Sequence, residues 1–200
     1  MEPVDIVETV PVETASLPKP KKEVFDVSFW PGRRLVLSSF KGRILVHIRE
    51  YLDMGGKEYP TKKGVCLTPG RLSALRRRIE EIDALLIQLS TNAEYNVTIG
   101  NDPLYYQHLG GGIYAIINEK YYGVDLRRYW VPMGQSKPVP TRNGIYLPAS
   151  QWTALKMKLD ELLEAHPGLA DNVECALAHG GNQMEYFGCP ECMPFGYDCV

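Results

Sequence analysis

Alternation of apolar and polar residues dominates the first third of the chain and predicts a series of short β-strands. Within residues 25–29 the apolar side chains fall on every second position, and Leu35 and Leu37 repeat the pattern in the next segment. A period of two places these side chains on one face of a half-buried strand. The Pro-Gly pair at 31–32 and the Lys-Gly pair at 41–42 predict turns, the second a tight hairpin. The predicted strands cover residues 25–29, 33–40, 43–52 and 64–67.

The third predicted strand has two chemically different faces. One face mixes a base, an imidazole and an aromatic ring, and we expect it to meet a ligand, whereas the other is aliphatic and is expected in the core. The ligand face is Leu45, His47, Arg49 and Tyr51, and the core face is Ile44, Val46 and Ile48.

A helix is predicted directly after the fourth strand. Thr68 is a good N-cap residue, and Pro69 is favoured at the first helical position. Apolar residues then recur at spacings of three and four, which predicts one continuous amphipathic helix over residues 69–89. Its apolar stripe, suited to packing on the sheet and on another helix, is Leu72, Leu75, Ile79, Ile82, Leu86 and Leu89.

Basic residues gather at the turns of this segment, and an aromatic residue precedes the first of them. Lysine and arginine neutralise phosphates, and an exposed ring stacks on unpaired bases. Together these residue types indicate a surface that grips a single nucleic-acid strand. The candidate contact residues are Phe40, Lys41, Arg43, Arg49, Lys62, Lys63 and Gly64.

The segment from residue 40 to residue 89 resembles the single-stranded-DNA-binding domain of the eukaryotic transcriptional coactivator called positive cofactor four. The resemblance rests on Phe-Lys-Gly-Arg at 40–43, Ile-Arg-Glu-Tyr at 48–51 and Lys-Lys-Gly at 62–64, followed by a strand and a helix. It implies a curved antiparallel sheet packed on one helix, working as a dimer that holds unpaired DNA. It also implies that the contact residues above are the binding set. One departure is Leu52, where the family has Trp.

The chain repeats the pattern once. Residues 60–67 (PTKKGVCL) match residues 140–147 (PTRNGIYL) at an offset of 80, and the helix that follows matches at the same offset. Residues 25–29 match residues 95–99 at an offset of 70. Repeat two is therefore predicted to hold about ten extra residues between its first strand and Pro140. Residues 90–94 are predicted to link the repeats.

Two registers are open for the middle of repeat two. In the first, residues 104–109 and 113–118 form a hairpin that mirrors the hairpin at Phe40, at an offset of 69. In the second, residues 126–130 mirror residues 48–52, which places Arg127 and Trp130 where the resemblance implies Arg and Trp. We favour the first, because its offset barely changes and a glycine run is a natural turn.

Repeat two keeps few of the contact residues in the favoured register. Asn118 replaces Arg49 and Asn143 replaces Lys63, whereas Arg142 retains the positive charge of Lys62. Repeat two is therefore predicted to be mainly structural, with Arg142 as its remaining contact. The alternative is a separate aromatic and basic platform at Tyr121-Tyr122 and residues 127–130.

Residues 170–200 have no counterpart in repeat one. A C-x3-H and a C-x2-C half-site, separated by nine residues, have spacings suited to zinc. The alternative is an acidic tail with incidental cysteines, because one C-x2-C pair is a weak signal. No other cofactor is expected. The candidate ligands are Cys175, His179, Cys189 and Cys192, and Cys199 is a substitute for one of them.

The net charge of −2 conceals a strong segregation of charge along the chain. Residues 1–20 carry −3, residues 21–95 carry +5 and residues 170–200 carry −5. A basic segment between acidic ends is expected where tails weaken non-specific binding, although charged tails also serve solubility alone. The four histidines are scattered and no paired-carboxylate or nucleophile motif stands out, which argues against an enzyme.

The N-terminal residues bear on localisation. They are acidic and interrupted by prolines, unlike a secretory signal, and no apolar run is long enough for a transmembrane helix. The basic cluster at residues 19–22 suits nuclear import, although such a run is also common in linkers. We expect a protein that is nuclear or otherwise intracellular, not secreted, with no membrane partner.

The sequence thus predicts an α+β protein of two tandem repeats, each a curved four-stranded antiparallel sheet plus a C-terminal helix, packed as a monomeric pseudo-dimer. The resemblance implies a coactivator that binds single-stranded DNA or unpaired duplex regions without strong sequence preference, with the transcription machinery as a further partner. The alternative is a protein-interaction scaffold that has lost DNA binding. The expected boundaries are residues 1–22 (disordered), 23–92 (repeat one), 93–168 (repeat two) and 169–200 (acidic tail).

Overall fold

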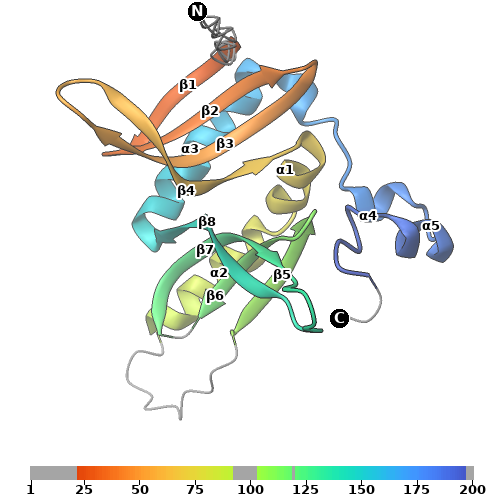
Figure 1. Ribbon diagram of the computed structural model, residues 1–200. Helices are drawn as coiled ribbons and strands as arrows, with labels where there is room; N and C mark the ends of the chain where they lie inside the picture. The colour runs from red at the N-terminus through yellow and green to blue at the C-terminus, as the bar shows by residue number, and fades with distance from the viewer. Residues whose placement is uncertain (1–21, 92–102, 119, 197–200) are drawn as a thin grey trace, which may run out of the picture.

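The computed structural model describes residues 22–91, 103–118 and 120–196. Two four-stranded antiparallel sheets, one from each repeat, lie at the two ends of the molecule, and the tail lies at its side (Figure 1). Helices follow each sheet, so the predicted α+β class is confirmed. The predicted strand at 95–99 lies outside the described residues, as does the predicted disordered segment apart from Lys22.

Sheet one is a meander in which each strand pairs with the next one along the chain. Lys41 (φ 49°) and Gly42 (φ 75°) both have positive φ at the β2–β3 turn. Two positive φ values give the tight hairpin whose twist matches that of the flanking strands. The strands are β1 (Lys22–Trp30), β2 (Arg33–Phe40), β3 (Arg43–Asp53) and β4 (Glu58–Leu67).

Sheet two has the same order of strands and the same antiparallel pairing. Its first strand begins at Tyr105, whereas the preceding helix ends at Thr91. Most of the predicted linker at 90–94 lies outside the described residues. Strand β1 ends at Trp30 and β5 at Gly110, an offset of 80 that equals the offset from Pro60 to Pro140, so the prediction of about ten extra residues between the first strand and Pro140 is wrong. The strands are β5 (Tyr105–Gly110), β6 (Ile113–Asn118), β7 (Tyr121–Trp130) and β8 (Val139–Pro148).

Strand pairing decides between the two registers. Arg49 on β3 lies opposite Gly64 on β4, and Arg127 on β7 lies opposite Gly144 on β8. Residues 126–130 therefore correspond to residues 48–52, and the register that the sequence argument favoured is wrong. The favoured register relied on short alternating segments and a glycine turn, which recur in many strands and hairpins.

Two equivalent backbone hydrogen bonds give the same correspondence between the residues of the two repeats. The Tyr51 N–H donates to the Gly32 carbonyl at 2.7 Å, and the Tyr129 N–H donates to the Gly112 carbonyl at 2.7 Å. The glycine run at 110–112 is thus the counterpart of the Pro31-Gly32 turn and not of the turn beside Phe40. The counterpart of the Phe40 turn joins β6 to β7.

The helix predicted over residues 69–89 is broken at Arg77 and Arg78. The Thr68 hydroxyl accepts from the Arg71 N–H, which confirms the predicted N-cap. At the break the Arg78 backbone N–H bonds to Leu75. The Arg78 guanidinium donates at 2.8 Å to the Ala74 carbonyl. In a continuous helix that carbonyl would accept from the Arg78 backbone N–H. A side chain that takes a helical carbonyl in this way ends the regular ladder.

Repeat one therefore ends in two helices, and repeat two ends in one long helix followed by short ones. None of the helices in the described part of the chain is long and apolar enough to cross a bilayer. The helices are α1 (Pro69–Arg76), α2 (Ile79–Thr91), α3 (Ala149–Ala165), the 3-10 turn η1 (Pro167–Leu169), α4 (Cys175–Ala178) and α5 (Gln183–Gly188).

The helices cross between the repeats. Helix α3 of repeat two lies against β1 and β2 of sheet one, while α1 and α2 of repeat one lie against β5 and β7 of sheet two (Figure 1). Trp152 on α3 donates to Asp83 on α2 at 2.7 Å, and Lys156 pairs with the same carboxylate. The predicted contact between the two helical stripes is confirmed.

A single hydrophobic core results from this exchange. Leu72 and Leu75 of α1, Ile82 of α2 and Leu155 of α3 are fully buried in one cluster with the inner faces of both sheets. Neither repeat closes a core of its own, which is the arrangement of a pseudo-dimer within one chain.

The faces of β3 are only partly as predicted. Val46 and Ile48 are buried in the core, whereas Ile44 is 45% exposed. His47, predicted to face a ligand, is buried, and its Nε2 lies 2.9 Å from Ser38 Oγ. His47 is therefore part of the sheet's internal packing.

Candidate nucleic-acid interface

The β2–β3 turn presents an aromatic ring beside positive charge. Phe40 pairs with Arg43 across the turn and is 43% exposed. The Lys41 ammonium lies 5.6 Å from the centroid of the Phe40 ring. Arg43 is also exposed. The turn thus offers a stacking surface and cations for phosphates, the combination that binds single strands.

Arg49 and Gly64 form a close cross-strand contact. A Cβ on Gly64 would lie 2.6 Å from the Ile48 carbonyl oxygen and 2.8 Å from the Arg49 Cα, and its φ is 156°. The glycine is required by the approach of β3 to β4. The Arg49 guanidinium donates to the Thr61 carbonyl at 3.1 Å, and its Nε is buried without an acceptor among the described residues. Arg49 therefore braces β4 as well as carrying charge.

The two lysines before Gly64 differ in their surroundings. Both are exposed, and the Lys63 backbone N–H is fixed by the Thr61 hydroxyl at 3.0 Å. The Lys63 ammonium lies 3.0 Å from a Glu50 carboxylate oxygen. Part of the Lys63 charge is thus neutralised, and Lys62 carries more of the positive potential.

A groove of about 380 Å³ lies where the two repeats meet. Arg49 and Lys62 line it from sheet one, Arg71 lines it from α1, and Arg128 and Asn143 line it from sheet two. Strands β4 and β8 lie side by side here. Sequence reasoning missed Arg71, and it offered Arg128 only within the alternative platform at residues 127–130, because only the exchange of helices and the contact of the sheets bring these arginines to the groove.

The counterparts in repeat two form the same brace with less charge. The Arg127 guanidinium donates to the Thr141 carbonyl at 2.8 Å, as Arg49 does to Thr61. Asp125 also accepts from the Arg127 Nε, at 2.8 Å. Arg127 is therefore neutralised and held in place.

The other predicted residues of repeat two are accessible. Arg142 is exposed, and Trp130 is 51% exposed at the end of β7. Trp130 corresponds to Leu52, which is 56% exposed, so the ring lies in the place where the resemblance implies one. The structure thus brings the predicted residues of repeat one to one side of the groove and leaves Trp130 at a strand end.

Part of the chain that forms this surface is similar in sequence to known proteins. Residues 31–77 match the family described as Transcriptional Coactivator p15 (PC4). These residues are a domain of that family. No solved structure matches the chain.

Relatives of the PC4-family domain carry names from transcription. The chain is 43% identical over 51 residues to the RNA polymerase II transcriptional coactivator KELP of Arabidopsis thaliana, covering 26% of this chain and 31% of KELP. It is 36% identical over 59 residues to the coactivator KIWI of the same plant, covering 30% of this chain and 55% of KIWI. A putative RNA polymerase II transcriptional coactivator of Neurospora crassa is 40% identical over 60 residues, with 28% of this chain and 35% of that protein covered.

The match covers only part of each protein. It spans about a third to just over half of the length of these relatives. Within this chain it runs from the β1–β2 turn to the end of α1, so it includes the Phe40 turn and the Lys62-Lys63 segment. Sheet two and the tail lie beyond the matched PC4-family domain.

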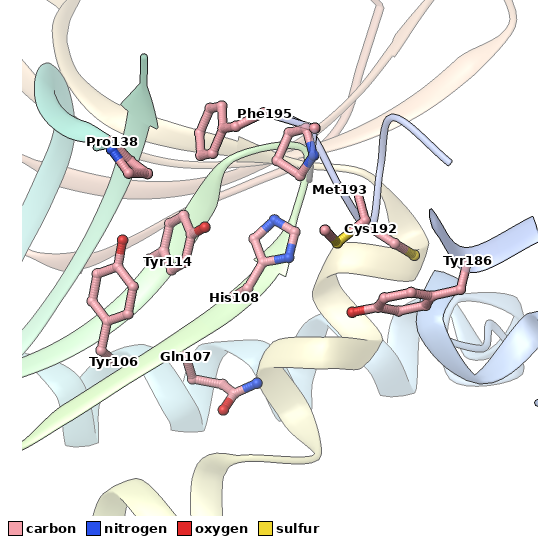
Figure 2. A pocket seen from close by; sticks show the side chains of 11 residues that line it. Tyr106, Gln107, His108, Tyr114, Pro138, Tyr186, Cys192, Met193 and Phe195 are labelled. Carbon is pink, nitrogen blue, oxygen red and sulfur yellow. The ribbon is translucent and has the colours of Figure 1, made fainter. Parts of the chain in front are cut away.

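Sheet two carries an aromatic cluster on the face turned away from the core. The rings of Tyr106 and Tyr114 stack at 4.4 Å, and Tyr129 packs edge-on against both. Figure 2 shows the Tyr106 and Tyr114 rings beside His108. Burial lowers the pKa of His108 to about 4, although Glu191 acts in the opposite direction, so the imidazole is neutral at pH 7.

The tail closes this aromatic surface into a pocket of about 380 Å³. Met193, Pro194 and Phe195 form one wall, and Pro138 from the β7–β8 loop lies opposite (Figure 2). The pocket is apolar, with the Tyr and His side chains as its polar groups. The pocket therefore depends on where the tail lies relative to sheet two.

The four predicted metal ligands of the tail lie together. The ligating atoms of Cys175, His179, Cys189 and Cys192 are all within 4.8 Å of one another. Cys199 lies outside the described residues. The tail therefore holds a compact thiol and imidazole cluster, separate from the basic groove.

Proposed function

We propose that this protein binds single-stranded DNA along the basic groove between its two repeats, as a PC4-family transcription coactivator that is nuclear or otherwise intracellular. The observation that carries the proposal is the meeting of Arg49 and Lys62 from one repeat with Arg128 from the other. The match to the PC4 family and the names of the relatives, which are transcriptional coactivators, support the proposed role in transcription. The proposed partners are unpaired DNA and the transcription machinery, and the role is binding rather than catalysis.

Binding would combine charge and stacking. Phosphates would lie against Lys62 and Arg128 in the groove and against Arg43 at the turn, which gives an affinity that falls as salt rises. A base would stack on Phe40, an interaction worth roughly 1–3 kcal/mol that tolerates any sequence. Because a stacked ring needs an unpaired base, single strands are expected to bind better than duplex.

A protein-interaction scaffold is the second candidate function. Acidic partners neutralise several cations near the groove: Glu50 beside Lys63, Asp125 beside Arg127, and Glu191 beside Arg71. If these pairs remove too much positive potential, the pseudo-dimer would keep the fold and lose DNA binding.

One titration separates these functions. Oligothymidine and a fully paired duplex of equal length are titrated with the full chain at two salt concentrations, with Lys62→Ala as the test variant. Lys158→Ala removes an equal charge from α3, where Lys158 pairs with Glu161, and serves as the matched control. We expect tighter binding of the single strand, a weaker Lys62→Ala and an unchanged Lys158→Ala. Equal affinity for both DNA forms would contradict the proposed preference for single strands, and no binding at low salt would favour the scaffold.

A further inference from the structure

The tail cluster has the dimensions of a tetrahedral metal site. The sulfur of Cys175 lies 3.6 Å from that of Cys189 and 3.7 Å from the Nε2 of His179. Zinc bound at about 2.3 Å from sulfur and 2.0–2.1 Å from nitrogen separates its ligand atoms by roughly 3.5–3.8 Å. These two separations therefore match a bound zinc ion, and all four ligand atoms lie within 4.8 Å of one another.

The histidine has a carboxylate on its far side. Nδ1 of His179 lies 3.7 Å from a Glu185 carboxylate oxygen, while Nε2 faces the sulfur of Cys175. Metal-bound histidines commonly direct their second nitrogen to a carboxylate, which orients the ring. The second nitrogen of His179 is placed for that role.

The two short helices of the tail have no core of their own. Helices α4 and α5 have four and six residues, which is too short to be stable alone. Neither helix contains a buried residue. Small units without a core are usually held by disulfides or by a structural metal.

We propose that Cys175, His179, Cys189 and Cys192 bind one zinc ion as a closed structural site. Three thiolates and one imidazole leave no position for substrate, so the site is structural and not catalytic. The metal joins α4 to the segment after α5.

The site fixes a contact between the tail and the body. Glu191, between two of the ligands, accepts from Arg71 at 2.6 Å through one side-chain oxygen, and its carbonyl accepts from the Gly111 N–H at 2.7 Å. A Cβ at Gly111 would overlap the Arg71 guanidinium, so the glycine turn leaves room for this ion pair. Glu174, next to Cys175, pairs with Arg78 at 2.7 Å.

Metal content of the full-length, untagged protein, purified under reducing conditions, is the first measurement. We expect one zinc per chain. Replacement by cobalt should give the absorption of a tetrahedral site, together with a thiolate-to-metal charge-transfer band whose intensity corresponds to three thiolates. Cys66→Ser is the control, since Cys66 lies on β4 outside the cluster, and it should retain stoichiometric metal. Cys199→Ser tests the substitute ligand that the sequence offers, and it should also retain stoichiometric metal.

The variants then test each ligand. Cys189→Ser and His179→Ala should lose stoichiometric zinc, and Glu185→Gln should lower zinc affinity by about 10–100-fold. Zinc-free protein that takes up no cobalt would overturn the proposal, as would full zinc content in Cys189→Ser or loss of zinc in Cys199→Ser. A disulfide between Cys175 and Cys189 in the reduced preparation would also overturn it. The cobalt spectrum of the unaltered chain decides the matter if a variant does not fold.

Discussion

The two sheets share a backbone frame but carry different chemistry on their outer faces. Arg34 of sheet one pairs with Asp26 at 2.7 Å and with Glu58, and its guanidinium lies 5.6 Å from the Tyr51 ring centroid. Tyr114 occupies the corresponding place in sheet two, because it lies opposite Arg127 as Arg34 lies opposite Arg49. A charged network in one sheet thus corresponds to an aromatic stack in the other.

What the sheets share is structural support. Both have an arginine that donates to a threonine carbonyl, and both have a glycine opposite that arginine. Features present in both halves of a pseudo-dimer serve the fold first. The binding surface is therefore expected where the halves differ, which is at the Phe40 turn and at Lys62 and Lys63. A further difference is that Asp125 neutralises Arg127 in repeat two.

The largest expected effect comes from the two equivalent glycines. Gly64→Ala sets a Cβ against the backbone of Ile48 and Arg49, at a φ of 156°, and we expect a loss of about 2–4 kcal/mol in the free energy of unfolding. Gly144→Ala meets side-chain atoms of Arg127 and not backbone, and shifting that side chain weakens its bonds to Asp125 and Thr141, so the cost should be about 1–2 kcal/mol.

Chemical denaturation of the two glycine variants measures this difference. Gly134→Ala, where φ is 78° and a Cβ meets nothing within 4 Å, controls for positive-φ strain without a steric clash. Equal losses for Gly64→Ala and Gly144→Ala would contradict the view that sheet one has the tighter frame.

The glycine–arginine pairs also explain which strands could be located from the sequence. The match of residues 60–67 to residues 140–147 located β4 and β8 correctly, because its glycine has a specific cross-strand partner. Residues 95–99 only alternate in polarity, as any half-buried strand does, and they misplaced the register. Periodicity reports burial but does not identify which strand is which.

The groove and the helix break depend on contacts between distant segments. Arg78 pairs with Glu174, and Arg71 with Glu191, which no local pattern in the sequence indicates. Likewise Arg128 reaches the groove only because β8 lies along β4. That the four candidate ligands of the tail lie together was predictable, since their spacing is local and metal chemistry restricts it.

Stacking at the Phe40 turn gives the next largest effect. Phe40→Ala should weaken oligothymidine binding by roughly 1–3 kcal/mol, because the ring is exposed beside Lys41. Trp130→Ala should have a smaller effect, since Asp125 neutralises the nearby Arg127. Fluorescence anisotropy titrations of both variants test the order. A larger loss from Trp130→Ala would move the binding surface to repeat two.

Loss of positive charge from β4 and from β8 should distinguish the two repeats further. Lys62→Ala with Lys63→Ala should reduce the salt slope of single-strand binding by about 1.4, because each phosphate contact contributes about 0.7. Arg142→Ala removes the matching charge from repeat two and should reduce the slope by at most about 0.7. If the double variant reduces the salt slope by only about 0.7, Lys63 is held by Glu50 and does not contact DNA.

The smallest effect concerns the acidic tail at the edge of the groove. Glu191→Gln removes the carboxylate that pairs with Arg71, one of the cations lining the groove. The freed charge should raise single-strand affinity up to about fivefold at low salt, because an ion pair at a partly exposed site is worth about 0–1 kcal/mol. Glu164→Gln, exposed at the end of α3, makes the same change in net charge and should leave affinity nearly unchanged. A decrease in affinity for Glu191→Gln would mean that the pair holds Arg71 in its binding position. Zinc content measured on the same sample separates that outcome from disruption of the tail, since Glu191 is not among the proposed ligands.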